Sequence, residues 1–104
     1  MTAEKIFVYA EYQVAVAFDQ IDWLSINPEM KKFTGLKSKT WLSGVNNNTV
    51  GGFYEFTSLD SAQQYIDELL IPFAKQMNGK LTVKLFNGDV VKEASVDMSS
   101  PYYV

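Results

Sequence analysis

The 104-residue chain contains no cysteine, no histidine and no arginine. Without cysteine it can form neither a disulfide framework nor a thiolate site, a composition that fits a reducing compartment. Without histidine, it cannot form Ser-His or Cys-His nucleophile systems, an ordinary zinc site or a histidine-ligated haem. Any acid–base chemistry therefore falls to Asp, Glu, Lys or Tyr side chains.

Positive charge is scarce as well. The chain has nine lysines and twelve acidic residues, so its net charge is -3 and its isoelectric point lies near 4.8. It offers no basic field to nucleic acid or to an anionic membrane. No glycine-rich phosphate loop is present and no apolar run approaches membrane-spanning length. Acidic Glu4 and a strand-like run stand where a signal peptide would be basic and then apolar. We therefore expect a single cytoplasmic domain over residues 1–104.

The most informative stretch runs from Gly35 to Phe56, where aromatic and β-branched residues flank a cluster of Gly and Asn. This pattern predicts a β-hairpin. Because side chains alternate along a strand, Lys39 and Trp41 lie on one face of the first strand. Gly52, Tyr54 and Phe56 lie on one face of the second. The strand register decides whether these two groups share a face, and the sequence leaves it open.

Adjacent glycines in the second hairpin strand are a further feature. Gly51-Gly52 predicts either a bulge or bare backbone against which something packs closely. A ligand is one candidate, and a Trp ring from the neighbouring strand is the other.

The first strand and the first helix precede the hairpin. Residues 5–12 alternate as a strand that is apolar on both faces. Residues 18–26 have helical spacing, and Asn27-Pro28 is expected to end or kink that helix before a further turn or two through Phe33. Trp23 lies off the apolar stripe, either at the edge of the core or in contact with a pocket or partner.

The strongest helical stripe follows the hairpin. Ser58 is a good N-cap, and Pro72 predicts a break near residues 70–71 with a short continuation to Gln76. Residues 80–86 alternate as a half-buried final strand.

The tail over residues 89–104 is ambiguous. Val90-Val91 suits the start of a short strand, while Ser99-Ser100-Pro101 favours irregular chain. The end, Tyr102-Tyr103-Val104, either contacts a partner subunit or frays.

The resulting order is strand, helix, strand, strand, helix, strand. It predicts an α+β fold of the ferredoxin-like βαββαβ type, with an antiparallel sheet whose helices cover one face. Phe7 and Tyr9 alternate with Ile6 and Val8, so the uncovered face still carries large apolar side chains. Monomers seldom expose such patches, and we therefore expect a homodimer that buries sheet against sheet.

One group of motifs lies within residues 35–86 of this order. It consists of Gly35-Leu36, Lys39, Trp41, the segment Gly51-Gly52-Phe53-Tyr54-Glu55-Phe56, and the helix around Ser61-Ala62 and Tyr65. These motifs resemble the YdhR-type mono-oxygenase family of the dimeric α+β barrel superfamily. The first strand fits the resemblance loosely and the tail hardly at all. The resemblance implies a homodimeric barrel with a pocket between sheet and helices in each subunit.

The resemblance also implies a reaction. Related members of the superfamily oxygenate aromatic or quinol-like molecules without metal or flavin, so we expect a cofactor-independent mono-oxygenase with molecular oxygen as co-substrate. An electron-rich phenolate can itself reduce oxygen if the protein stabilises the anion and excludes water. The expected catalytic residues are Trp41 and Tyr54, as wall and hydrogen-bond donor, and Lys39, as a cation for the substrate anion. The expected substrate-binding residues are Tyr9, Phe56, Gly52 and Trp23.

Plainer interpretations stand beside each of these. Trp41 and Tyr54 also suit packed cross-strand aromatics, and Lys39 suits a solvated strand residue. Glu11 and Glu55 are in-strand carboxylates that suit a buried base or an edge or dimer contact. A non-catalytic dimer that binds a small aromatic ligand would have the same pocket. An RNA-recognition motif has the same strand order, but the acidic charge disfavours phosphate binding.

Overall fold

The computed structural model describes residues 4–13 and 18–103. One antiparallel sheet has the strand order β2-β3-β1-β4. Its strands are β1 (Ile6–Gln13), β2 (Leu36–Ser43), β3 (Thr49–Phe56) and β4 (Lys80–Asn87). The helical elements are η1 (Phe18–Gln20), α1 (Trp23–Lys31), α2 (Leu59–Tyr65), η2 (Ile66–Leu70), α3 (Ile71–Gln76) and α4 (Lys92–Asp97). This is the predicted ferredoxin-like α+β order, and β1 and β4 begin and end within one residue of the predicted bounds.

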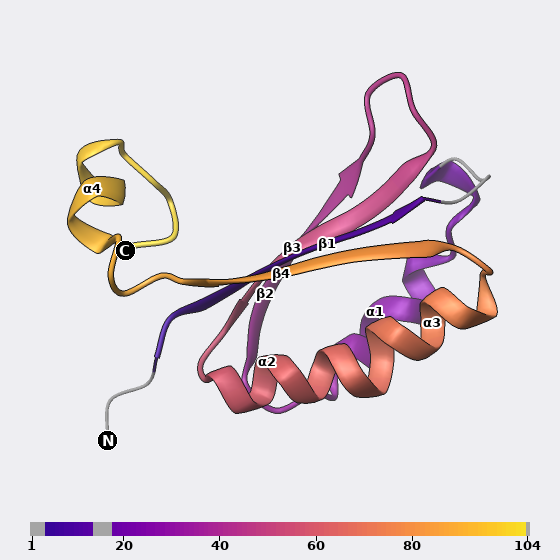
Figure 1. The fold of residues 1–104 in the computed structure, drawn as a ribbon, viewed down its shortest axis with the longest axis horizontal. Coiled ribbons are helices and arrows are strands. Elements are labelled where there is room, and N and C mark those ends of the chain that lie inside the picture. Colours follow the sequence, from indigo (N-terminus) through magenta and orange to yellow (C-terminus); the bar gives the residue numbers. More distant parts are fainter. Residues whose placement is uncertain (1–3, 14–17, 104) are drawn as a thin grey trace.

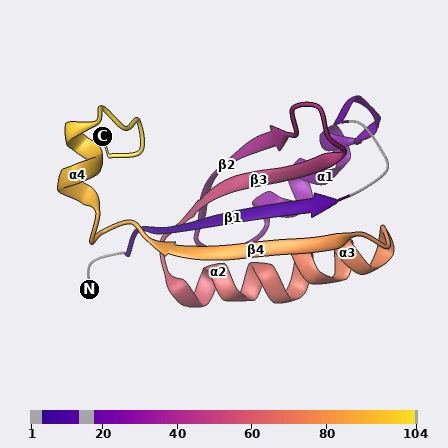
Figure 2. The ribbon, with the colours of Figure 1, turned by 45° about the horizontal axis from the view of Figure 1, so that its top comes forward.

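The helices are distributed unevenly about the sheet. Figure 1 shows α1, α2 and α3 on the same side of the sheet, while α4 lies apart from them, beyond one end of the strands. Turning the molecule keeps this arrangement (Figure 2). One sheet face is therefore covered by three helices and the other is free of them (Figure 1), as the predicted order of elements implies.

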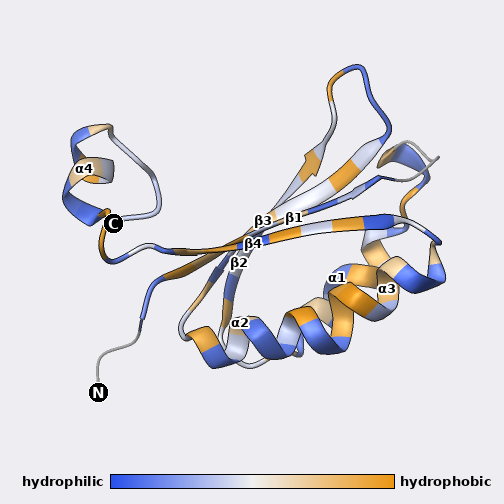
Figure 3. Ribbon diagram, viewed as in Figure 1, coloured by the Kyte–Doolittle hydropathy of each residue, from blue (hydrophilic) through white to orange (hydrophobic). Residues whose placement is uncertain are grey.

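The covered face holds the hydrophobic core. From β1 it receives Ile6, Val8, Ala10 and Tyr12, all buried. Hydrophobic residues recur along α1, α2 and α3, which lie against this face (Figure 3). No helix among the described residues combines the length and the apolar character needed to cross a membrane.

The first helix departs from the sequence prediction. Residues 18–20 form a separate short 3-10 turn, and α1 then runs through Pro28 without ending there. Pro28 removes one helical hydrogen bond, but Ile26, Met30 and Phe33 pack against the core on either side of it. Tertiary packing therefore holds the helix together across a residue that would end an isolated one.

The second helical region confirms the predicted cap and shows how the chain passes Pro72. The Ser58 hydroxyl accepts a hydrogen bond from the Ser61 backbone N–H at 3.1 Å. The predicted break is a wider π-helical turn at Ile66–Leu70, after which the helix continues to Gln76. A π turn at this place shifts the hydrogen-bond ladder just before the proline ring. Asn78 then closes the helix with a φ of 51°.

The tail folds back onto its own chain. Of the alternatives left open for the tail, a strand starting at Val90-Val91 is wrong, because a turn there leads into α4. The Tyr102 ring lies 5.7 Å from Phe7 and 5.3 Å from Phe53, on the helix-free sheet face. The Tyr103 hydroxyl donates to the Gly88 carbonyl at 2.7 Å. Val104, which belongs to the predicted sticky end, lies outside the described residues.

Candidate active site

The strand register decides the question that the hairpin leaves open. Lys39 pairs with Tyr54 and Trp41 pairs with Gly52, so all four residues lie on the helix-covered face. The two candidate groups of the hairpin therefore form one cluster.

Gly52 makes room for Lys39. A Cβ atom at Gly52 would lie 2.6 Å from the Lys39 Cε atom and 3.0 Å from the Tyr54 ring. The side chain that packs against the bare backbone at Gly52 is thus the methylene chain of Lys39, not a Trp ring. The predicted bulge is absent from Gly51-Gly52, and the register irregularity of this strand pair lies between Leu36 and Ser38.

Lys39 is a partly buried amine held between aromatic rings. Its Nζ atom lies 3.2 Å from the Trp41 ring centroid and 4.9 Å from that of Tyr54. It also donates to the Met30 sulfur at 3.3 Å. Across residues 4–13 and 18–103, no carboxylate comes within ion-pair distance of it.

The environment of Lys39 changes its protonation. Burial lowers the pKa of Lys39 from 10.5 to about 7, because a desolvated ammonium ion is disfavoured. The aromatic faces attract the ammonium form, so burial and ring contact act in opposite directions. Near neutral pH the amine is therefore able both to accept a proton and to carry a positive charge.

Trp41 is fixed in orientation. Its indole Nε1–H donates to the Asn27 Oδ1 atom of α1 at 3.0 Å, and the Phe18 ring meets it edge-on at 5.5 Å. Neither Asn27 nor Met30 is a site residue in the sequence analysis. Their spacing of three residues places both on one face of α1, and the packing of that face against β2 is known only from the structure.

A cleft opens between α1 and β2 at this cluster. Its volume is about 220 Å³. Its lining consists of Asn27, Met30, Lys31, Leu36, Lys37, Ser38, Lys39 and Trp41. Two of these, Lys31 and Lys39, are lysines without an ion-pair partner among the described residues, so the cleft favours an anion, whereas the Lys37 Nζ atom lies 3.4 Å from Glu55. The Trp41 ring and Leu36 offer the anion an apolar wall.

Tyr54 and Phe56 lie behind the cleft. Tyr54 is only 1% exposed and Phe56 is fully buried, and both pack against the Tyr65 ring. Burial raises the pKa of Tyr54 well above 10, so its hydroxyl stays protonated. Tyr54 contacts Lys39 from the core side and does not line the cleft, which departs from the expected position as a donor toward substrate.

Tyr9 and Trp23 lie away from the cluster. Tyr9 pairs with Phe53 and so faces the helix-free side of the sheet, opposite Tyr54. Trp23 is 43% exposed on α1 and does not line the cleft. Tyr9, expected to bind substrate together with Trp41, thus lies on the other sheet face from it, since Tyr9 alternates with Val8 and Ala10, which both face the helices.

The in-strand carboxylates lie on the helix-free face. Glu55 is 6% exposed, and its Oε2 atom lies 2.8 Å from the Lys5 Nζ atom and 3.4 Å from that of Lys37. It is a buried carboxylate that two lysines neutralise. Among the described residues, no group of three or more His, Cys, Asp or Glu side chains is arranged to hold a metal ion.

Comparison with curated proteins gives no match. Among solved structures, the chain is similar to SnoaB, a cofactor-independent oxygenase from Streptomyces nogalater. The TM-score is 0.57 at 16% sequence identity, over 82% of this chain and 93% of that one. This likeness shows the shared fold.

The family comparison covers most of the chain. The family described as "Putative mono-oxygenase ydhR" matches residues 7–97, a range that includes the whole hairpin, the cleft and both helical regions. The chain thus belongs to the ydhR mono-oxygenase family.

Proposed function

We propose that this protein is a mono-oxygenase that takes a small phenolic substrate, of the quinol or polyphenol type, into the cleft between α1 and β2. The observation that carries this proposal is Lys39, a desolvated amine without a carboxylate partner among the described residues, at the wall of a lysine-lined cleft. An amine with a pKa near 7 suits a general base at neutral pH. Family membership and the likeness to a cofactor-independent oxygenase support the same reaction class.

The proposed reaction needs only substrate, oxygen and the protein. Neutral Lys39 accepts the phenolic proton, and the resulting ammonium stabilises the phenolate. The phenolate passes one electron to O2, and the two radicals combine to form a carbon–oxygen bond. Lys39 returns its proton to the peroxide anion, and the O–O bond then breaks with loss of water. A substrate with two hydrogens and O2 thus yield an oxidised substrate with one added oxygen, and H2O. No external reductant is consumed.

The remaining residues of the cleft hold the substrate. Trp41, oriented by Asn27, supplies a flat apolar wall for an aromatic ring. Lys31 adds positive charge at the mouth, which attracts a phenolate. Tyr54 and Gly52 support Lys39 from beneath and are positioning residues in this proposal.

A homodimer formed through the helix-free face completes the proposal. That face carries Phe53 and Leu42 in the sheet, and Phe86 of the edge strand β4, which pairs with Phe7, is 48% exposed. Tyr102 covers only one end of it. Burying the remainder against a second copy would remove a large apolar area from water, and the tail over residues 89–103 would then border the partner. Sedimentation equilibrium at micromolar concentration tests this, and a monomer would contradict it.

The same face argues against RNA binding. A stacking platform needs open aromatic rings, yet Phe7 is 8% exposed beneath Tyr102 and Tyr103. The carboxylate of Glu55 lies next to Phe7 on this face and would repel RNA phosphates.

Oxygen consumption tests the reaction. Purified protein is mixed with a panel of quinols and polyphenols, and oxygen uptake is followed together with tryptophan fluorescence. We expect turnover that Lys39→Met lowers by about 100-fold or more, the usual contribution of a general base. Lys75→Met, at an exposed lysine of α3, is the matched control and should leave turnover unchanged.

Two further results decide between the candidates. A kcat/KM that rises with pH to a plateau, with its midpoint near pH 7, identifies Lys39 as the base. Saturable fluorescence quenching without any oxygen uptake would instead show a binding protein and contradict the proposed reaction.

A further inference from the structure

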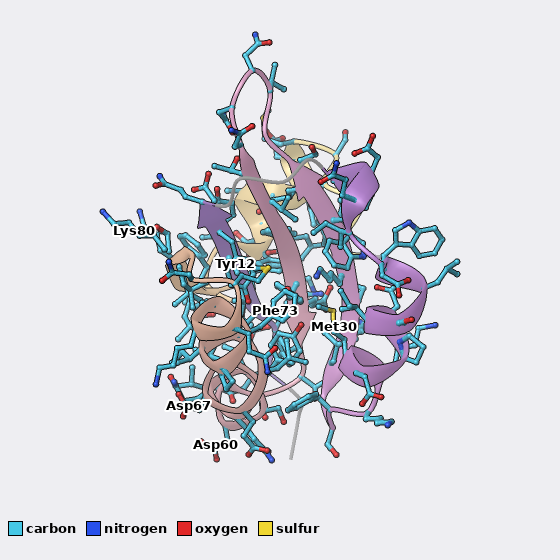
Figure 4. The ribbon with its side chains drawn as sticks, turned by 90° about the vertical axis from the view of Figure 1, so that its right-hand side faces the viewer. Tyr12, Met30, Asp60, Asp67, Phe73 and Lys80 are labelled. Atoms are coloured by element: carbon cyan, nitrogen blue, oxygen red, sulfur yellow. The ribbon has the colours of Figure 1, made fainter. Side chains whose placement is uncertain are left out.

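A second, smaller hollow lies on the inner side of the cleft wall. Its volume is about 10 Å³, and Met30, Lys39 and Trp41 line both it and the substrate cleft. The other side chains around it include Tyr12, Val50 and Phe73. Figure 4 shows Tyr12, Met30 and Phe73 pointing into the interior between the sheet and the helices. Three side chains thus separate an outer cleft from an inner space, which we call the inner hollow.

The inner hollow is small and apolar. A volume of this size admits about one water-sized sphere, and a buried water needs two to four polar partners. The two polar groups at its edge are already engaged, because the Tyr12 hydroxyl donates to the Leu70 carbonyl at 3.1 Å and Lys39 donates to the Met30 sulfur. Apart from the backbone of Gly51, sulfur, methyl and aromatic groups form the rest of the lining. A small molecule that requires no hydrogen bond fits this space better than water does.

We infer that the inner hollow binds the molecular oxygen that the proposed reaction consumes. This inference rests on the proposed function, for which O2 is the second substrate. O2 is apolar and diatomic, and from here it would reach the phenolic substrate by passing between Met30, Lys39 and Trp41, the side chains that line both spaces. The site holds the oxidant next to the amine that generates the phenolate, and it keeps water from the same position.

Dissolved oxygen itself is the direct probe. O2 is paramagnetic and speeds the relaxation of nearby methyl protons, so methyl NMR under oxygen pressure, referenced to nitrogen, reports contact without any substrate. Met30 and Val50 line the inner hollow and are 4% and 5% exposed. Val8 and Ile66 are equally buried core residues, at 0% and 3%, that do not line it. They are the matched controls for oxygen that merely diffuses through the protein.

We expect relaxation enhancements for the Met30 and Val50 methyls several times those of Val8 and Ile66. Equal or smaller enhancements at Met30 and Val50 would overturn the inference. Because this measurement needs no turnover, it separates the inference from the proposed function. Preferential contact at Met30 and Val50 supports an oxygen site even if no phenol on the panel is oxidised.

A cavity-filling variant tests the consequence for turnover. Val50→Ile adds a methylene to the inner hollow, and we expect it to raise the KM for O2 several-fold while leaving the KM for the phenol unchanged. Val83→Ile makes the same change at a partly buried position of β4 outside the lining and should alter neither constant. An unchanged KM for O2 in a folded Val50→Ile protein overturns the inference. If that variant does not fold, the NMR measurement on the wild-type protein decides.

Discussion

Two lysines of this protein have similar aromatic surroundings and different electrostatic ones. Lys5 lies 5.9 Å from the Phe7 ring centroid and 4.9 Å from that of Tyr103. Lys39 likewise lies 3.2 Å from the ring centroid of Trp41 and 4.9 Å from that of Tyr54. Lys5 also meets a buried carboxylate, Glu55, and a backbone carbonyl, whereas the further contact of Lys39 is a thioether.

The difference shows what a carboxylate does to a lysine among aromatic rings. On the helix-free face, Glu55 and the Tyr102 carbonyl use the ammonium of Lys5 to tie the tail to the sheet. On the covered face, burial without a counter-charge from the described residues leaves Lys39 with a pKa of about 7. One lysine is a structural tie and the other is available for proton transfer, because the anion lies beside Lys5.

Removing the carboxylate that pairs with Lys5 should have the largest effect on stability. Glu55→Gln leaves Lys5 partly buried without its anion, so we expect the free energy of unfolding to fall by about 3 kcal/mol. Glu68→Gln, at an exposed position of η2, is the control and should change it by less than about 0.5 kcal/mol. Urea denaturation measures both variants. A loss in Glu55→Gln as small as that of the control would show that the Lys5 cluster does not stabilise the fold.

Placing a carboxylate beside Lys39 should give it the electrostatic surroundings of Lys5. Met30→Glu places an anion where the thioether now contacts Lys39, and we expect the pKa of Lys39 to rise by about two units. The neutral fraction at pH 7, and with it kcat/KM, should then fall about 50-fold, from about one half to about one hundredth. Met30→Gln has the same shape without the charge and should keep the midpoint near pH 7. A pH profile that is identical in the two variants would exclude Lys39 as the base.

Removing the second lysine should stabilise the protein as its activity is lost. The pKa of Lys39 is about 7 in the folded state and has its ordinary value of 10.5 in the unfolded chain, so the unfolded state binds more protons between these values. Stability of the wild type therefore rises with pH across this window, and the burial cost is greatest below pH 7. We expect Lys39→Met to raise the free energy of unfolding by about 2 kcal/mol at pH 6, less than full linkage because Lys39 is not completely buried.

The gain from Lys39→Met should shrink steadily toward pH 10, because the cost that it removes disappears there. Denaturant titrations at several pH values measure this difference. A gain that is independent of pH would mean that Lys39 is protonated throughout.

The smallest expected effect concerns the orientation of Trp41. Asn27→Ala removes the acceptor of the indole N–H, and we expect a loss of about 1 kcal/mol in unfolding free energy. The emission of Trp41 should also shift to the red in a Trp23→Phe background, where it is the remaining tryptophan. Asn27→Asp retains an acceptor oxygen and should preserve the wild-type spectrum. Matching spectra for the Ala and Asp variants would show that this hydrogen bond does not hold the ring.

The order of elements was predictable because each signal is local. Alternation in β1, the Ser58 cap and the Gly and Asn turn of the hairpin each act within a few residues. Pro28 is the exception, because its neighbours on α1 pack against the core and outweigh the lost hydrogen bond.

The site was predictable only in part, because faces of different strands are related through register. Lys39 and Trp41 share a face by alternation within β2, and this held. The face of Tyr9 depends on how β1 pairs with β3, and no local pattern reports that pairing. The contacts of Asn27 and Met30 with β2 depend on how α1 packs, which alternation and helical periodicity do not specify.

The π-helical turn at Ile66–Leu70 has a consequence for how the inner hollow is built. It contains one residue more than an α-helical turn would, and each helical residue turns the chain by about 100°. The surplus residue therefore sets the rotational phase of everything after it, including Phe73 and Met77. Shortening the turn by one residue would give a regular helix and rotate Phe73 and Met77 away from the inner hollow. The space beside Lys39 therefore depends on a helical irregularity that lies far from Lys39 in the sequence.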